Sequence, residues 1–270
     1  MNRLDQELVS RGLARSRTEA GKLIEAQRVS LDGAPCTKAS KKVAADVAIL
    51  VAAAEGEEYV SRAGHKLAGA LDVFTTISPK GLRCLDAGAS TGGFTDVLLR
   101  RGAAQVVAAD VGHGQLVAQI REDSRVVVYE GLNVRYLEPE SIGGVVDLVV
   151  ADLSFISLTL VLEALAKATK PGGSLVLMVK PQFEVGREFL NRTGVVSNPQ
   201  LRRSAVQAVV AKANQVGLAL RGLARSPLAG QDGNAEFFLW LAADPELIGT
   251  QEDTEDDVAN SAMLQSVDYS

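Results

Sequence analysis

The sequence predicts an α/β fold, in which a small α+β module precedes a doubly wound, seven-stranded sheet. Two patterns lead to this prediction. From Tyr59 onwards, short apolar runs alternate with helical patterns, as in a parallel sheet whose two faces are covered by helices. Residues 1–42, in contrast, hold nine Lys/Arg against five Asp/Glu, which sets them apart as a basic module. A chain of 270 residues, 47% of them hydrophobic, can bury one full core and a small second unit.

The basic module has the pattern of helix, turn, helix and strand. Leu4 and Leu8 keep helical spacing, and Ser16 stands where it can cap a second helix. The stretch RVSLDGAPC then alternates like a short strand and turns at an Asp-Gly pair. We expect this module to span residues 1–53 and a short linker to follow at 54–60.

In sequence order, RLDQELVSRGLARSRTEAGKLIEAQRVSLDG resembles the S4 RNA-binding module. The resemblance implies that basic side chains near one surface follow the phosphates of an RNA, largely through charge and therefore with a strong salt dependence. It assigns this role to Arg3, Arg11, Arg15, Arg17, Lys22 and Arg28. Gln27 stands where that family usually has a glycine at the helix end, so the turn there must be made differently. The alternative is that these arginines form an ordinary solvated helix face.

The body of the protein is expected at 61–244. It contains seven apolar runs of strand length, namely RCLDAG, QVVAADV, VVVYEG, VDLVVADL, SLVLMVK, LALRGLA and EFFLWLA. Helices between them are expected to begin near Gly92, Gly114, Leu158 and Asn198. The tail at 245–270 is strongly acidic and has no basic residue, so we expect it to be disordered.

A glycine-rich turn follows the first of these runs, in the stretch LDAGASTGGF. Gly88 permits a tight turn, and Gly92 and Gly93 open a helix whose N-terminal amides can face a polar ligand. The dinucleotide fingerprint G-x-G-x-x-G would need a glycine in place of Ser90, and a Walker loop would need Gly-Lys-Ser/Thr. Neither of these phosphate-binding motifs therefore fits.

A carboxylate follows at the place where such sheets bind a ribose. Asp110 stands 24 residues after Asp86, at the end of the next run, and could accept hydrogen bonds from both ribose hydroxyls. An adenosine cofactor without a pyrophosphate fits this arrangement, and we expect S-adenosylmethionine. The expected cofactor-binding residues are Asp86, Gly88, Ser90, Gly92, Gly93, Phe94, Asp110, Val111, Gly112, Asn133 and Asp152. The alternative is a glycine-rich turn of any α/β protein, with Asp110 as an N-cap.

Four charged residues can converge over this cofactor. Asp152 and Lys180 follow the fourth and fifth runs, and neighbouring parallel strands would bring both side chains to one edge of the sheet. Lys66 stands at the start of a helix that precedes the first strand, and Glu236 stands at the mouth of the last strand. Taken singly, each residue could belong to a surface salt bridge, and Lys180 could simply extend to water.

Residues 59–243 resemble methyltransferases of the FtsJ/RrmJ type, whose Lys-Asp-Lys-Glu tetrad matches Lys66, Asp152, Lys180 and Glu236 in order and context. With the S4-like module in front, the chain resembles the TlyA family of ribosomal RNA cytidine 2′-O-methyltransferases, in particular its mycobacterial members. The resemblance implies a Rossmann-like class I methyltransferase fold, a catalytic tetrad, S-adenosylmethionine as cofactor, and 16S and 23S rRNA in ribosomal subunits as substrates. Whether the second lysine removes the proton of the ribose hydroxyl or orients the hydroxyl stays open.

Two functions from other classes are alternatives to this one. A membrane-active haemolysin would need an amphipathic or membrane-spanning segment, but the longest apolar stretch, which begins at Val145, is interrupted by Asp147 and Asp152. An S4-type RNA-binding protein with an inactive methyltransferase fold would bind S-adenosylmethionine without transferring its methyl group. The tetrad argues against this second alternative.

The composition excludes several other classes. Cys36 and Cys84 form neither a disulfide framework nor a metal-binding spacing, and His65 and His113 are the only histidines, so we expect no metal site. The first residues lack the apolar segment of a signal peptide, and the cysteine usage favours a reducing compartment. We therefore expect a cytoplasmic monomer without a membrane partner.

Overall fold

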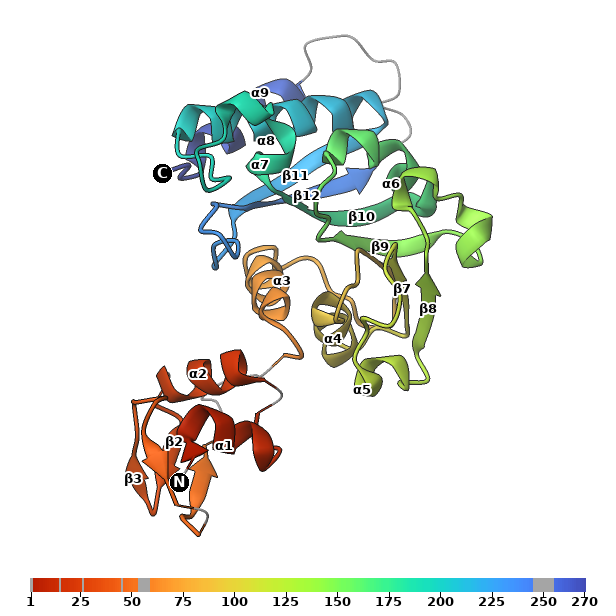
Figure 1. Cartoon of the computed structure of the whole chain (residues 1–270). Coiled ribbons are helices and arrows are strands. Elements are labelled where there is room, and N and C mark those ends of the chain that lie inside the picture. Colours follow the sequence, from red (N-terminus) through yellow and green to blue (C-terminus); the bar gives the residue numbers. More distant parts are fainter. Residues whose placement is uncertain (1, 15, 26, 45, 53–58, 245–254) are drawn as a thin grey trace. The chain divides into compact units, whose positions relative to one another are not determined.

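A computed structural model of the chain describes all residues except 1, 15, 26, 45, 53–58 and 245–254 (Figure 1). The chain divides into two compact units, residues 1–58 and 59–270. Each unit has a hydrophobic core of its own. The division falls inside the linker expected at 54–60, most of which lies outside the described residues.

The first unit combines two short helices with short strands. The helices are α1 (Leu4–Ser10) and α2 (Arg17–Glu25), and the strands are β1 (Asn2–Arg3), β2 (Val29–Leu31), β3 (Ala34–Pro35), β4 (Lys42–Val43) and β5 (Ile49–Val51). β2 pairs with β3 and β5, and β1 pairs with β4, all antiparallel. Leu4, Leu8, Ile24 and Val29 are buried together in the core of this unit.

Local sequence signals explain the turns of the first unit. The Ser16 hydroxyl accepts a hydrogen bond from the Glu19 N–H at 3.2 Å, as expected for a helix cap. Asp32 and Gly33 both have positive φ, 48° and 84°, which suits the tight turn between β2 and β3. Gln27 also has a positive φ, 57°, so it adopts the left-handed conformation that a glycine would otherwise provide after a helix.

The second unit is built on one seven-stranded sheet, as the sequence predicted. Its strands are β6 (Arg83–Ala87), β7 (Gln105–Asp110), β8 (Val126–Glu130), β9 (Val146–Ala151), β10 (Thr169–Val179), β11 (Leu218–Arg225) and β12 (Phe237–Ala243). Their order across the sheet is β11-β12-β10-β9-β6-β7-β8. The chain therefore crosses over after β8 to place β9 beside β6, and the strand order reverses at β6.

The expectation of a parallel sheet holds for β6 to β10 but not for β12, which is antiparallel to both β10 and β11. An antiparallel connection needs only a short loop, whereas a parallel one needs a crossover of a dozen or more residues, usually a helix. The reversal has a consequence for the site. Val179, at the end of β10, pairs with Phe237, at the start of β12, so Glu236 and Lys180 flank the same pair of residues.

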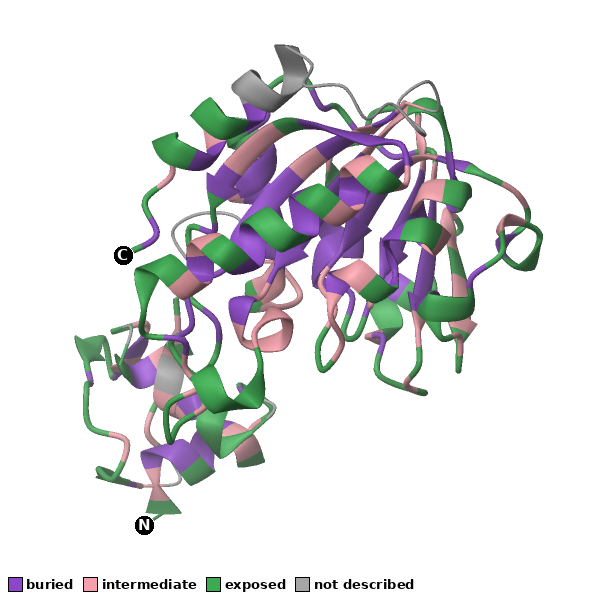
Figure 2. Cartoon of the chain, turned by 90° about the horizontal axis from the view of Figure 1, so that it is seen from above, coloured by how far each residue is buried: buried purple, intermediate pink, exposed green. Residues whose placement is uncertain are grey.

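Helices cover both faces of the sheet. They are α3 (Arg62–Val73), α4 (Gly93–Arg100), α5 (Ala118–Arg121), α6 (Leu162–Ala168), α7 (Pro181–Glu184), α8 (Pro199–Gln215) and α9 (Glu255–Ser266), with 3-10 turns η1 (Val134–Tyr136), η2 (Pro139–Ile142), η3 (Leu158–Leu160) and η4 (Arg187–Phe189). Buried residues of α3, α4 and α5 pack on one face, and those of α6, α8 and α9 pack on the other. Figure 2 shows the buried strands between helices whose outer surfaces are exposed. The helix expected near Gly114 begins later, at Ala118.

The expectation that 245–270 is disordered is wrong for its second half. Residues 245–254 lie outside the described part of the chain, but α9 follows, and Leu264 and Tyr269 are buried against the core of the larger unit. The Tyr269 ring lies 5.1 Å from that of Phe237, and its backbone carbonyl accepts a hydrogen bond from Arg202 at 2.8 Å. The expectation followed the acidic composition of the whole tail and overlooked its few apolar residues, such as Leu264 and Tyr269, which pack on the core.

Candidate active site

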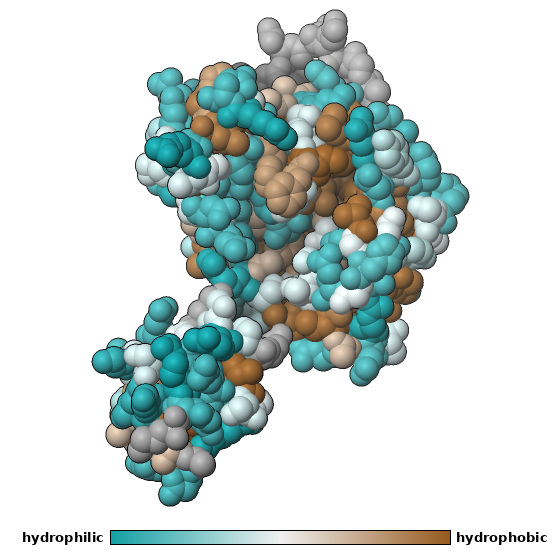
Figure 3. Space-filling view, viewed as in Figure 1, coloured by the Kyte–Doolittle hydropathy of each residue, from teal (hydrophilic) through white to brown (hydrophobic). Residues whose placement is uncertain are grey.

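Two adjoining cavities open where β6, β7, β9 and β10 end. The larger encloses about 450 Å³ and has mainly apolar walls, and the smaller encloses about 200 Å³. Gly88, Ser90, Asp152 and Ser154 line both. In the space-filling view, apolar side chains are visible inside a hollow of the larger unit (Figure 3). Cavities at the carboxyl ends of strands, beside a reversal of strand order, are where open α/β sheets bind their ligands.

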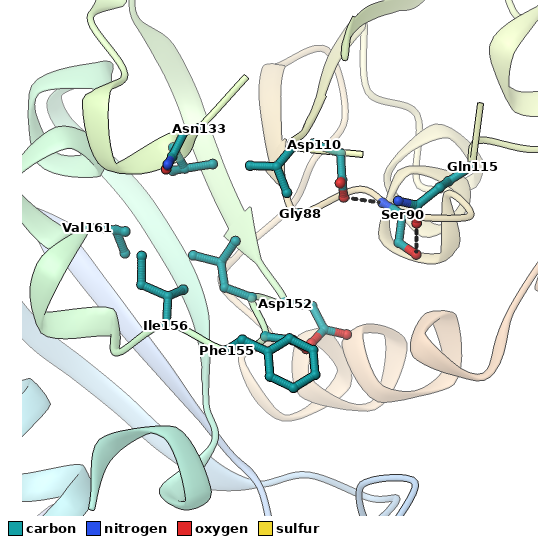
Figure 4. Close-up of a pocket in the computed structure, with 13 residues that line it drawn as sticks. Gly88, Ser90, Asp110, Gln115, Asn133, Asp152, Phe155, Ile156 and Val161 are labelled. Carbon is teal, nitrogen blue, oxygen red and sulfur yellow. Dashed lines mark hydrogen bonds between the residues drawn. The ribbon is translucent and has the colours of Figure 1, made fainter. Parts of the chain in front are cut away.

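Asp110 presents a fixed carboxylate to the larger cavity. It ends β7, and its two oxygens accept backbone hydrogen bonds from Ser90 at 2.9 Å and Gly112 at 2.7 Å. Gln115, which also lines this cavity, accepts a hydrogen bond from the Ser90 hydroxyl at 3.2 Å. Figure 4 shows this group on one side of the cavity and Asn133, Ile156 and Val161 on the other. The cavity thus has polar acceptors on one side, and an amide beside apolar side chains on the other.

The backbone at Gly88 explains why a glycine is needed at the end of β6. Its φ is +86°, a conformation that L side chains rarely adopt. A Cβ at this position would lie 2.9 Å from the carbonyl oxygen of Asp152 and 3.0 Å from the side chain of Leu153. Gly88 therefore allows the chain after β9 to approach the end of β6 closely, and both segments line the larger cavity.

Of the other residues expected at the cofactor site, some line a cavity and others do not. Val111 and Asn133 line the larger cavity, and Gly93 and Phe94 line the smaller. Gly112 acts through its backbone N–H on Asp110, and Gly92 lines neither cavity. With φ +98°, Gly92 provides the left-handed residue that precedes α4.

Asp86 lies behind the cavities rather than in them. Its side chain is fully buried, and one carboxylate oxygen accepts a hydrogen bond from the Thr95 hydroxyl at 2.6 Å. The other oxygen has no partner among the described residues. Burial is the main cause that raises the pKa of Asp86 to about 7, and the Thr95 hydroxyl opposes it. The geometry fits an internal link between β6 and α4 better than direct contact with a ligand.

Lys66 and Glu236 form a buried ion pair. Their nitrogen and oxygen are 2.6 Å apart, and the side chains are only 11% and 3% exposed. Lys66 lies in the second turn of α3, and Glu236 directly precedes β12. Burial raises the pKa of Glu236, while the hydrogen bond and charge of Lys66 oppose this shift. The pair joins two elements that are 170 residues apart in sequence.

Lys180 and Asp152 form a second ion pair, from the ends of adjacent strands. The Lys180 ammonium lies 2.6 Å from a carboxylate oxygen of Asp152 and donates a hydrogen bond to the Ser154 hydroxyl at 2.9 Å. The Asp152 contact is a charge contact, because that oxygen accepts no well-aligned hydrogen bond within the described part. Both residues line the smaller cavity. All four residues expected in the tetrad thus form two lysine–carboxylate pairs at one end of the sheet.

Sequence reasoning missed the segment that follows β9, of which Leu153, Ser154, Phe155 and Ile156 line the larger cavity. Ser154 holds Lys180, and Phe155, which lines the larger cavity, is 91% exposed with a φ of +63°. Ser154 stands two residues after Asp152, but this spacing does not identify it as the acceptor of Lys180. The exposure of Phe155 follows from its backbone conformation, for which the sequence gives no direct signal.

In the first unit, two of the expected RNA-binding arginines are engaged with one carboxylate. Arg3 and Arg17 lie 2.9 Å and 2.8 Å from oxygens of Asp5. The hydrogen bonds and charges of these arginines hold the pKa of Asp5 well below its usual range. The side chain of Arg17 is nevertheless 58% exposed and that of Arg3 43%, so both can still meet a further anion.

The remaining expected RNA-binding residues differ in their surroundings. Arg11 is only 26% exposed, contacts Glu7 at 2.9 Å and donates to the Val47 carbonyl at 2.7 Å. Arg28 donates to a backbone carbonyl of the same unit at 3.0 Å. Arg15 and the side chain of Lys22 lie outside the described part of the chain. Because Arg11 contacts both Glu7 and the Val47 carbonyl, its side chain joins different elements of this unit.

Comparisons with known proteins agree with this geometry. The FtsJ-like methyltransferase family matches residues 59–243, and the S4 domain matches residues 2–49. The 16S/23S rRNA (cytidine-2′-O)-methyltransferase TlyA of Mycobacterium tuberculosis is 55% identical over 239 residues, which cover 88% of this chain and 89% of that protein. Hemolysin A of Brachyspira hyodysenteriae is 37% identical over 236 residues, with 87% and 97% covered.

A solved structure from Streptococcus thermophilus, which carries the provisional name of a hemolysin, superposes with a TM-score of 0.72 at 38% identity. The superposition covers 97% of this chain and 95% of that one. A family match over most of the chain, together with relatives of this identity and coverage, decides the family. The chain belongs to the FtsJ-like methyltransferases and, with its S4 domain in front, to the TlyA group among them.

Proposed function

We propose that this chain uses S-adenosylmethionine to methylate the ribose 2′-hydroxyl of cytidine in 16S and 23S rRNA. The observation that carries the proposal is the position of two lysine–carboxylate pairs, Lys180 with Asp152 and Lys66 with Glu236, at the edge of the sheet where the cavities open. The name of the M. tuberculosis relative supports the choice of substrate, and the S4 domain supports an RNA partner.

The larger cavity has the chemistry that S-adenosylmethionine requires. Its volume of about 450 Å³ lies in the range of small-molecule sites. The fixed carboxylate of Asp110 suits the two ribose hydroxyls, Asn133 can bond the edge of an adenine, and Ile156 and Val161 offer apolar contact to the ring. When bound, the cofactor supplies a methyl group on a sulfonium, with a neutral leaving group.

Lys180 is assigned the alignment of the ribose hydroxyl. A lysine ammonium has three donors. In the described part of the chain one of them bonds the Ser154 hydroxyl, and the charge of Asp152 holds the ammonium in place. A remaining donor can meet the substrate 2′-oxygen. The positive charge then stabilises the negative charge that develops on this oxygen as it bonds the methyl group and its proton passes to solvent water. Alignment of this kind is a large source of rate enhancement in a displacement reaction.

The Lys66–Glu236 pair is assigned the binding of the ribose and the balance of charge. Two buried charges at 2.6 Å are stable only as a pair, because either one alone would lack compensation. Glu236 precedes the residue that pairs with Val179, which places this carboxylate beside the end of β10. The pair lines neither cavity, but it lies next to Lys180 and can balance the charge there.

Phe155 is assigned the contact with the target base. A nucleotide flipped out of an RNA helix brings its ribose into an active site, and its unstacked base binds well to an aromatic face. The Phe155 ring is 91% exposed and belongs to the segment between the two cavities. Its ring lies 5.3 Å from that of Phe183, which directs one side of Phe155 towards the protein.

The proposal is tested with S-adenosylmethionine labelled in its methyl group and separated 30S and 50S ribosomal subunits. We expect label in the RNA of both subunits, and mapping of 2′-O-methyl groups should locate it on cytidines. Label in neither RNA would refute the proposal. Cofactor binding without any transfer would instead favour an RNA-binding protein whose methyltransferase fold is inactive.

A membrane-damaging activity is the second candidate, because two relatives carry the name hemolysin. In the part of the chain that the structure describes, no helix is long and apolar enough to cross a bilayer. Release of a fluorescent dye from liposomes tests this function directly. Release that depends on protein concentration and survives Lys180→Ala would establish it as a separate activity.

A further inference from the structure

The segment after β9 is bonded at its far end by a carboxylate from another element. Glu184 is the last residue of α7. One of its oxygens accepts a hydrogen bond from the Ser157 hydroxyl at 2.5 Å, and the other accepts one from the Leu158 N–H at 2.8 Å. Ser157 is the N-cap of η3, so Glu184 satisfies the first N–H of that turn from outside.

The same short stretch, 180–184, also bonds the near end of this segment. Lys180 contacts Asp152 and Ser154, and Glu184 contacts Ser157 and Leu158. The residues between these two attachments are 155 and 156, and the Phe155 ring packs 5.3 Å from Phe183. The segment that carries the exposed aromatic ring is therefore attached on both sides of that ring to the stretch 180–184, which comprises Lys180 and α7.

Phe155 needs such attachment because its backbone is strained. A φ of +63° is unfavourable for a residue with a bulky side chain and persists only where the surroundings impose it. Glu184 is partly buried. Burial raises the pKa of Glu184, and the Ser157 and Leu158 donors oppose that shift. Within the described part of the chain, the hydrogen bonds of the Glu184 carboxylate all go to this segment. Its role is therefore to hold the segment in place.

We propose that Glu184 is a positioning residue, which holds Phe155 in the exposed conformation that receives the target nucleotide. The inference rests on the proposed function, because it assigns Phe155 to the RNA. Glu184 itself does not line either cavity. It acts through Ser157 and Leu158. Loss of Glu184 should therefore lower methyl transfer only to the extent that Phe155 contributes to it.

The test is a double-mutant cycle on methyl transfer to ribosomal subunits, with kcat and KM for RNA measured on the full chain. A hydrogen bond to a charged group contributes about 1.5–3 kcal/mol, so Glu184→Ala should lower kcat/KM roughly tenfold or more. Phe155→Ala should lower it at least as much. The double variant should lie within about threefold of Phe155→Ala alone, because coupled residues are not additive.

Two further variants make the test specific. Glu184→Gln keeps an oxygen for the Leu158 N–H and should recover most of the activity that Glu184→Ala loses. Glu163→Ala removes a carboxylate of α6 that is 66% exposed and pairs with Lys167 on its own helix, so it should leave the activity unchanged. If Glu184→Ala does not fold, Ser157→Ala replaces it in the cycle, since it removes one of the two donors.

Each outcome separates the inference from the proposed function. Losses that multiply in the double variant, or full activity of Glu184→Ala, would refute the positioning role while leaving the methyltransferase function intact. No methylation by the unaltered chain would refute the proposed function, and the inference with it. Losses that overlap, with recovery in Glu184→Gln, would establish that Glu184 acts through Phe155.

Discussion

Lys180 joins two strands at the point where the reaction is proposed to occur, so it is the residue whose loss should separate binding from chemistry. We expect Lys180→Ala to keep the affinity for S-adenosylmethionine within a few fold and to reduce methyl transfer by at least about 100-fold, because alignment and charge stabilisation are lost together. Calorimetric titration and labelled-methyl transfer measure the two quantities. Lys170→Ala, at the other end of β10, is the control, because Lys170 is exposed and pairs with Asp147.

Methyl transfer by Lys180→Ala at the rate of the unaltered chain would exclude the assigned role.

The sequence could predict that Asp152 and Lys180 meet, because both follow adjacent parallel strands. It could not predict Ser154 as the acceptor of Lys180 or Phe155 as an exposed ring. Both depend on the path of the chain after β9, which the close approach to Gly88 determines.

Asp86 gives a prediction about pH and stability. Its folded-state pKa of about 7 lies above its ordinary value, so the folded protein retains a proton that the unfolded chain releases. This contribution is present below about pH 4 and is lost as pH rises towards 7. Relative to Asp86→Asn, the free energy of unfolding should therefore fall across that window, by up to about 1.4 kcal/mol per pH unit. Urea unfolding from pH 4.5 to 8.5 measures the difference.

The asparagine variant is a suitable reference because its side chain keeps an oxygen for the Thr95 hydroxyl and cannot ionise. Above about pH 7 the difference between the two proteins should become constant. A difference that is already constant from pH 4.5 upwards would contradict the raised pKa of the buried carboxyl.

At the scale of elements, the main departures from the sequence-based expectation are β12 and α9. All seven apolar runs became strands, because runs of β-branched and aliphatic residues report burial directly. Their direction is not encoded in the same way, and β12 proved to be antiparallel to both neighbours. This direction is what brings Glu236 to the end of β10. The sequence did not predict α9 because it is mostly polar, and few of its residues at 260–266, where burial is described, are buried.

The packing of the C-terminal residues predicts a stabilising role for Tyr269. Its buried ring lies on Phe237, one residue after Glu236. We expect Tyr269→Ala to lower the free energy of unfolding by about 3 kcal/mol, because a buried aromatic side chain leaves a cavity when it is removed. Tyr136→Ala, whose ring is 72% exposed, should change it by no more than about 0.5 kcal/mol. Equal effects of the two substitutions in urea unfolding would contradict this packing.

At the scale of the whole molecule, the uneven distribution of charge matters more than the net charge of −5. The first 42 residues carry an excess of four positive charges, although the chain as a whole is acidic. The sequence alone predicts this uneven distribution of charge, because the charge of a continuous segment depends only on its composition. It could not predict that Arg3 and Arg17 share Asp5 or that Arg11 serves the internal structure of its unit. Those pairings depend on contacts between residues on different elements.

The exposed Arg17 therefore gives the sharpest test of RNA binding by the first unit. Each phosphate contact contributes about 0.7–0.9 to the slope of the logarithm of affinity against the logarithm of salt concentration. Arg17→Gln should weaken binding to ribosomal RNA and make this slope shallower by about that amount. Arg225→Gln, which breaks an exposed contact with Asp268, is the control and should leave the slope unchanged. An unchanged slope for Arg17→Gln would assign Arg17 to its ion pair with Asp5, because a residue that only stabilises the fold releases no counterions on binding.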